Sequence, residues 1–195
     1  MNKKRLESIS DIFFVAIIVV MMVHIEVPCS NSFSSLFDEI YFFIFYILTF
    51  VFIGILWNCH YHLFQVVSVV NGKIFWINLF FMFWLTMIPF TVDWMISTNF
   101  SRNPVSIYIF ILFSCSVCYR FLEKTIIKLE GKKYLLSIFF VNDEKIFSSN
   151  FFYFFSFVIS WFFPKISLLF LSFLIIFLFF SRRKIEKYFN EYESN

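Results

Sequence analysis

Residues 5–28 of the chain read RLESISDIFFVAIIVVMMVHIEVP. After Asp11 the stretch continues for twelve residues without a polar side chain. A helix that crosses the roughly 30 Å of hydrocarbon in a bilayer needs roughly 20 residues, because each residue adds about 1.5 Å. We therefore expect a membrane helix over residues 9–28. No small-residue cleavage site follows Val27 and Pro28, which favours a retained helix over a cleaved signal peptide.

The rest of the chain has the same character. Its 195 residues are 61% hydrophobic and 15% charged, whereas soluble domains are roughly 45–50% apolar and about 25% charged. We predict an all-α integral membrane protein, one six-helix bundle over residues 1–195. The predicted helices cover residues 9–28, 39–64, 74–97, 104–122, 146–163 and 166–181. The last two are short and joined by a tight turn, which makes them an antiparallel hairpin, and residues 123–145 are expected to form a surface loop with an amphipathic piece.

Charge predicts the orientation of these helices. Six spans put both termini on one side of the membrane, together with the loops at 65–73 and 123–145. Of the 16 lysines and arginines, all except Arg102 and Lys165 fall on that side. Positively charged loops stay in the cytoplasm, so both termini are expected to be cytoplasmic. The net charge of +3 reflects this topology, and we expect no nucleic-acid partner.

Several classes of function lack their sequence signatures. A glycine-rich phosphate loop, a G-x-S-x-G turn and an H-E-x-x-H helix are all missing, so we expect neither an enzyme nor a bound cofactor. Cys115 and Cys118 form a C-x-x-C inside an apolar span with no histidine nearby, which favours buried packing over a metal site. The three isolated glycines cannot build a potassium filter of backbone carbonyls.

One face of the first helix carries small side chains. At 100° per residue, Ala16, Val20, Val23 and Val27 fall within a narrow arc, and Asp11 points to the opposite side, toward the rest of its own subunit. Small residues let helices approach closely, so this stripe fits an ordinary helix-packing face. The same stripe fits a face that lines a pore. The residues alone leave both interpretations open.

Polar residues gather at one depth near the cytoplasmic ends of the first three helices. An ionised carboxylate in a membrane helix is costly unless it is paired. We therefore hypothesise that Asp11 is held by Arg5, His60 or Asn78, which lie at the same expected depth as Trp57. Alternatively, Arg5 and Asp11 sit at the headgroup level and are simply solvated.

Short motifs recur along nearly the whole chain in a fixed order. They are the R-x-x-x-x-S-D of Arg5, Ser10 and Asp11, W-N-C-H at 57–60 followed by L-F at 63–64, W-I-N-L at 76–79, I-P-F at 88–90 and R-R-K-I-E at 182–186. This series resembles the transmembrane protein 175 family, the endolysosomal potassium channels and their bacterial relatives. The corresponding marks of that family are R-x-x-x-F-S-D, W-x-x-H with L-F, W-x-N-L, L-P-F and a basic R-R-I-E tail.

The resemblance implies a function and an assembly. It implies a homotetramer in the bacterial plasma membrane, embedded in the lipid bilayer, that conducts potassium or other monovalent cations. The first helices would line the central path, and rings of apolar side chains would form the constriction. It also implies an intrasubunit polar network that orients the pore helix and does not touch ions. The network residues would be Arg5, Ser10, Asp11, Trp57, His60 and Asn78.

The chain departs from the family pattern in the proposed pore. Five and eight residues after the motif aspartate, the family has a bulky Ile or Leu and often a Thr, whereas this chain has Ala16 and Val19. An alanine ring is wide, so we expect the constriction at Val20 and Val23 and a weaker selectivity among monovalent cations. Ile17 lies about 100° from the Ala16 direction, and we expect Met21 and Met22 to face the bundle.

The expected outer mouth also differs from the family. Relatives commonly end the first apolar run with an acid two residues before a base, whereas this chain has His24 and Glu26. Four Glu26 carboxylates would concentrate cations at the mouth; alternatively, Glu26 is simply solvated at the helix end. Two other functions stay open from the sequence, a non-conducting membrane scaffold or immunity-type protein and a small transporter.

Overall fold

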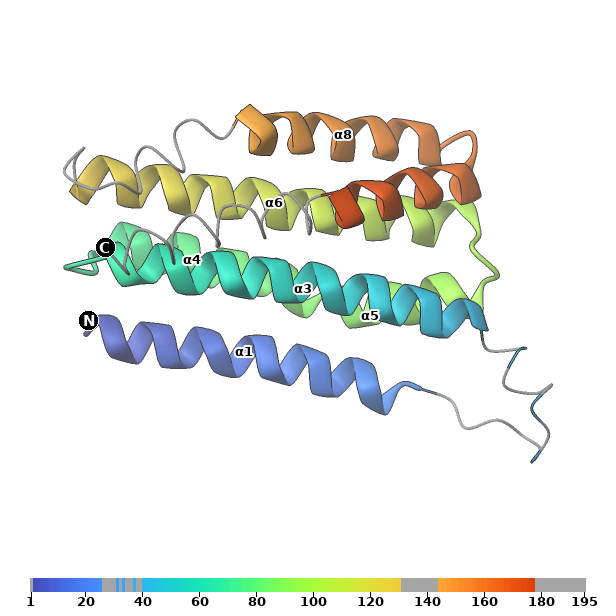
Figure 1. Ribbon diagram of the computed structural model, residues 1–195, viewed down its shortest axis with the longest axis horizontal. Helices are drawn as coiled ribbons and strands as arrows, with labels where there is room; N and C mark the ends of the chain where they lie inside the picture. Colours follow the sequence, from blue (N-terminus) through green and yellow to red (C-terminus); the bar gives the residue numbers. More distant parts are fainter. Residues whose placement is uncertain are drawn as a thin grey trace, which may run out of the picture.

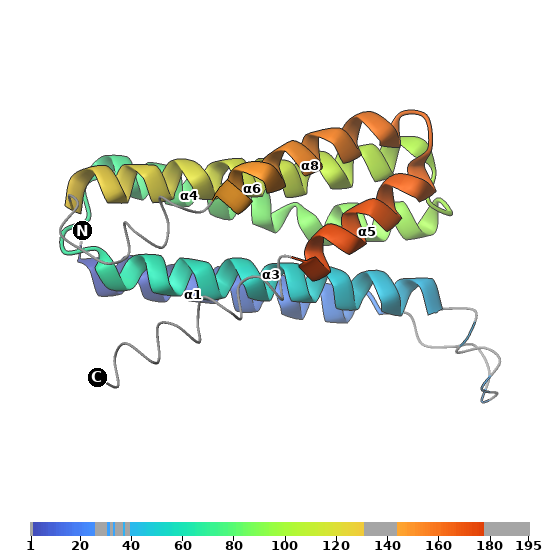
Figure 2. The same cartoon turned by 45° about the horizontal axis from the view of Figure 1, so that its top comes forward.

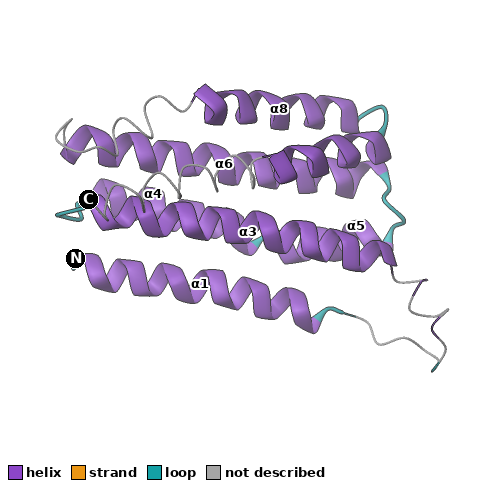
Figure 3. Ribbon diagram, viewed as in Figure 1, coloured by secondary structure: helices purple, strands orange, loops and turns teal. Residues whose placement is uncertain are grey.

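The computed structural model describes residues 2–25, 31, 33, 37, 40–130 and 144–177. Within these residues every regular element is a helix (Figure 3), which confirms the all-α prediction. The helices lie side by side along one long axis, with α1 at one edge and α8 at the other (Figure 1). Four helical segments are long and apolar enough to cross a membrane, and two shorter apolar helices follow them.

The first helix, α1 (Lys3–Val23), starts before the predicted residue 9. It does so because the side chain of Asn2 accepts a hydrogen bond from the backbone N–H of Lys4 and caps the first turn. The helix ends at Val23, and His24 is its C-cap residue. Residues 26–28, which we predicted as its last turn, lie outside the described residues.

The second helix, α3 (Ile40–Val66), follows the prediction of 39–64 closely, but the predicted helix 74–97 is two helices. They are α4 (Gly72–Thr86) and α5 (Ile88–Ser97), and Met87 forms the turn between them. Pro89 explains the break, because proline lacks an N–H and its ring clashes with the carbonyl of the preceding turn. The two helices together still amount to one candidate span of 26 residues.

The fourth span is the centre of the bundle. Helix α6 (Arg102–Glu130) packs against α4, α5 and α8 and has 67% of its apolar window buried, compared with 28% for α1. The predicted end at residue 122 was wrong, and so was the start of the predicted loop 123–145. The helix continues because Leu122 and Ile126 lie on its buried face. Residues 131–143 lie outside the described residues.

The last two helices form a hairpin. Helix α8 (Glu144–Ser160) and the helix Pro164–Phe177 are joined by a turn at residues 161–163 and run in opposite directions (Figure 1). Small polar side chains hold α8 on α6. The hydroxyls of Ser106 and Ser160 lie 2.8 Å apart, and Ser116 donates to Asn150 over 2.6 Å. Such pairs help helices associate in lipid, where apolar surfaces gain little from packing together.

Candidate functional site

Helix α1 lies at the edge of the bundle and has two different faces. Among the described elements it packs mainly against α3, α4 and α5, and Figure 2 shows it beside α3 after a 45° turn. Its buried residues recur every three or four positions: Leu6, Ser10, Phe14, Ile17 and Met21. This spacing is one stripe of a helix, and none of the described residues of the subunit covers the opposite side of α1.

The predicted pore residues lie on that uncovered side. Ala16, Val19, Val20 and Val23 are all exposed, and Val23 is the most exposed of them at 76%. The uncovered arc is wider than this stripe, because Ile12, Val15 and Met22 are exposed as well. Val27 lies outside the described residues.

The exposure of Ile17, Met21 and Met22 tests which residues of α1 belong to the predicted pore face. Ile17 is 3% exposed and therefore belongs to the packed face, as does Met21. The expectation that Met22 faces the bundle was wrong, since it is 64% exposed. Met22 lies 100° beyond Met21 on the helix, which is enough to carry it past the edge of the packed stripe.

Of the two predicted mouth residues at the C-terminal end of α1, the structure describes only His24. His24 is exposed, and its Nδ1 lies 2.7 Å from the carbonyl oxygen of Val20, one turn earlier. This contact satisfies one of the carbonyls that a helix end leaves without an intrahelical partner. Glu26 lies outside the described residues.

Asp11 is held by Trp57 on α3. The indole Nε1–H donates to the Asp11 carboxylate over 2.8 Å, and the contact is partly buried. The Trp57 ring also stacks on Phe14 of α1, with ring centroids 6.0 Å apart. Our hypothesis paired Asp11 with Arg5, His60 or Asn78, and the structure replaces those partners with Trp57. The side chain of Arg5 is exposed and makes none of the hydrogen bonds or ion pairs recorded among the described residues.

A second polar chain ties α1 to α4 and α3. His60 Nε2–H donates to Asn78 Oδ1 over 2.9 Å, and Asn78 Nδ2–H donates to Ser10 Oγ over 2.8 Å. The Ser10 hydroxyl in turn donates a hydrogen bond to the carbonyl oxygen of Leu6, at 2.9 Å. All three side chains are buried. Each of the three side chains therefore makes at least one hydrogen bond, as buried polar groups usually do, whereas the buried Nδ1 of His60 has no hydrogen-bond partner among the described residues.

Ser10 and Asp11 each attach α1 to a different helix. They are consecutive residues and so point about 100° apart around α1. Ser10 reaches Asn78 on α4, and Asp11 reaches Trp57 on α3. Two attachments in different directions fix the rotation of α1 about its own axis, which a single contact would not do.

Aromatic rings enclose His60, and the sequence did not reveal them. The rings of Phe14, Phe64 and Phe81 come from three helices, and their centroids lie 5.6, 4.3 and 6.2 Å from that of the imidazole. With 35 phenylalanines in the chain, no pattern singles out these three. They exclude water from the His60–Asn78–Ser10 chain, which strengthens its hydrogen bonds.

The described residues contain no candidate metal site. No group of three His, Cys, Asp or Glu side chains among them is arranged to hold a metal ion. Cys115 and Cys118 are buried in α6.

Removing the Asp11–Trp57 contact should destabilise the protein. We expect Asp11→Ala and Trp57→Phe each to lower the thermal unfolding midpoint of the purified protein in detergent, and the double variant to fall no further than the worse single one. The hydrogen bond has a charged acceptor, for which losses of about 1.5–3 kcal/mol are typical. Asn58→Ala, at an exposed neighbour of Trp57, should leave the midpoint unchanged. Additive losses would show that the two residues act independently.

The chain resembles known channels over most of its length. Residues 5–89 match the family described as "Endosomal/lysosomal potassium channel TMEM175". A potassium channel from Chryseobacterium sp. (strain P1-3) is 36% identical over 187 residues, which cover 96% of this chain and 97% of that relative. The fold is similar to the crystal structure of a lysosomal potassium-selective channel TMEM175 homolog from Chamaesiphon Minutus. That similarity has a TM-score of 0.77 at 18% identity and covers 90% of this chain and 95% of the other. The chain is therefore a multi-pass membrane protein of the TMEM175 potassium channel family, and not an enzyme.

Proposed function

We propose that four copies of this chain form a channel for potassium, with a pore lined by the uncovered face of α1. The observation that carries the proposal is the asymmetry of this helix. One face is tied to α3 and α4 by hydrogen bonds, whereas the other is apolar and has no cover among the described residues. The Chryseobacterium relative is named a potassium channel, and its 36% identity over nearly the whole chain supports potassium as the conducted ion.

The constriction in this proposal lies at Val20 and Val23. With α1 of each subunit turned toward a common axis, Ala16, Val20 and Val23 would form three successive rings, spaced four and three residues apart. The methyl of Ala16 leaves the first ring wide, so the two valine rings are the narrowest. Narrow apolar rings can gate by dewetting. Val19 lies on the neighbouring part of the exposed arc and contributes to the wall between the rings.

The polar contacts of α1 position the pore and do not contact the ion. Asp11 and Ser10 lie on the sides of the helix that face α3 and α4. They hold the rotation of α1 at the angle that presents the valines to the axis. A rotation of one residue, about 100°, would replace Val20 by Met21 at the same level.

The proposal also has both termini in the cytoplasm and the channel in a bacterial plasma membrane. Helices α4 and α6 run antiparallel (Figure 1), so Lys73 near the start of α4 and Lys128 near the end of α6 lie at the same end of the bundle. Lys3 is at this end too, since its Nζ donates to the carbonyl of Gln65. Arg102, at the other end, lies over the ring of Trp161 at 3.8 Å. Lysine-rich ends favour the cytoplasm.

The decisive experiment is a bilayer recording of purified protein with potassium on one side and sodium on the other. We expect an ohmic current whose reversal potential is displaced toward the potassium equilibrium potential. A reversal potential near zero would remove potassium selectivity. No current at all would favour the scaffold, and saturable uptake that depends on a counter-substrate would favour the transporter.

Polar substitutions in the two valine rings should open the channel. We expect Val20→Asn and Val23→Asn to raise the basal current several-fold, because a polar ring wets more readily than an apolar one. Met22→Asn is the matched control. Met22 is also exposed, but it lies on the other edge of the uncovered arc. If Met22→Asn opens the channel while both valine variants stay silent, the pore is lined by the other edge of α1.

Glu26 gives a test at the expected mouth. We expect Glu26→Gln to lower the conductance more at low salt than at high salt. A ring of carboxylates attracts cations, and dissolved salt screens this attraction. The screening length is about 10 Å at 0.1 M salt and longer in dilute buffer. Conductance is measured on single channels at two salt concentrations. An equal loss at both would indicate a packing defect and contradict an electrostatic role.

A further inference from the structure

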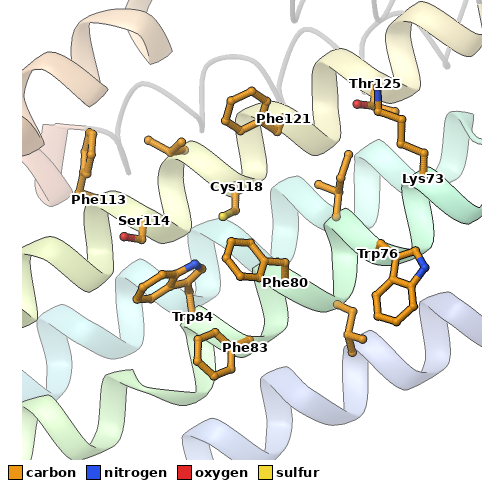
Figure 4. Close-up of a pocket in the computed structure, with 13 residues that line it drawn as sticks. Lys73, Trp76, Phe80, Phe83, Trp84, Phe113, Ser114, Cys118, Phe121 and Thr125 are labelled. Carbon is orange, nitrogen blue, oxygen red and sulfur yellow. The ribbon is translucent and has the colours of Figure 1, made fainter.

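A long groove opens between α4 and α6, on a part of the subunit that the α1 contacts do not use. Its volume is about 910 Å³. Figure 4 shows its walls, with Phe80, Phe83 and Trp84 from α4 opposite Phe113 and Phe121 from α6. Most of these rings are exposed in the subunit, among them Phe121 at 60%. Apart from its ends, the groove offers a ligand almost only hydrocarbon and aromatic surface.

One end of the groove differs from the rest. Lys73 from α4 and Thr125 from α6 both line the groove at this end, beside Trp76 (Figure 4). Lys128 lies one helical turn beyond Thr125 on the same stripe of α6. Lys73 also belongs to the first turn of α4, where the helix dipole favours negative charge. An anionic group is therefore favoured here and nowhere else along the groove.

The length of the groove distinguishes between two kinds of occupant. The α4 wall extends from Lys73 to Trp84, about 16 Å along a helix. This is about half of the 30 Å hydrocarbon core, or one leaflet. A transmembrane helix of a second subunit would need a groove of the full thickness, whereas a phospholipid has the required length and places its phosphate at the membrane surface.

We propose that this groove binds an anionic phospholipid of the leaflet at the Lys73 end. The acyl chains lie along the aromatic walls between α4 and α6. The phosphate accepts hydrogen bonds from the Lys73 ammonium and the Thr125 hydroxyl, with Lys128 adding positive charge at the mouth. This site lies apart from the α1 face and does not depend on conduction.

Native mass spectrometry of the purified protein with added phosphatidylglycerol or phosphatidylcholine tests the site. We expect selective retention of phosphatidylglycerol. Lys73→Gln should weaken its retention about fivefold, the effect of losing one lysine near an anionic surface. Lys124→Gln removes the same charge from the same end of α6, but from a position about 100° away from Thr125, and should have a smaller effect. Val117→Trp, which fills the groove, should abolish retention.

Three results would overturn the proposal. Equal retention of the two lipids would show that no anionic headgroup is recognised. Equal weakening by Lys73→Gln and Lys124→Gln would indicate general attraction to the surface and not a site. A change of oligomeric state in Val117→Trp with unchanged lipid retention would make the groove a contact between copies. Because the readout is lipid binding, a failed conduction experiment would leave this test unaffected.

Discussion

The attachment of α1 by polar contacts is the constraint on which the rest of the site depends. In a bilayer, apolar side chains are as well solvated by lipid as by one another, so the hydrophobic effect does not decide which face of a helix is buried. Hydrogen bonds do decide it. The Asp11–Trp57 contact at 2.8 Å and the chain from His60 through Asn78 to Ser10 face α3 and α4. The valines of the proposed pore face then lie on the side of α1 that no described helix covers.

The bundle behind α1 provides a rigid support for these contacts. Helix α6 is buried on most sides and packs against α4, α5 and α8. Its Tyr119 hydroxyl donates to the carbonyl of Cys59 on α3, which ties α3 to the centre of the bundle next to His60. Trp57 and Asn78 are therefore held by helices that are themselves anchored. A helix at the edge of the bundle can have one defined rotation only because its partners do not move independently.

Parts of the site were accessible from the sequence. The polar residues at the ends of the first three helices were expected in one layer because ionisable and amide groups in apolar spans are costly unless they meet. Asp11 meets Trp57, and His60 and Asn78 meet Ser10 in a separate chain, whereas Arg5 is exposed and takes part in neither. Which of these residues pair with each other could not be predicted, because the pairing depends on the rotation of each helix about its axis. The indole of Trp57, which sequence reasoning treated as a neighbour, is the partner of Asp11.

The amino-acid sequence was enough to assign the class of this protein, since hydropathy, the near absence of charge within the spans and the ordered motifs are local properties of the chain. It also determined the approximate helices, because a helix long enough to cross the bilayer requires a continuous apolar run. Four features became known from the folded chain: the division of one span into α4 and α5 before Pro89, the extent of α6, the rings that enclose His60 and the partner that holds Asp11. The extent of α6, the rings around His60 and the partner of Asp11 depend on contacts between residues far apart in the chain, which local hydropathy does not record. The break before Pro89 has a local cause, the proline itself, but the continuous apolar run favoured a single helix there.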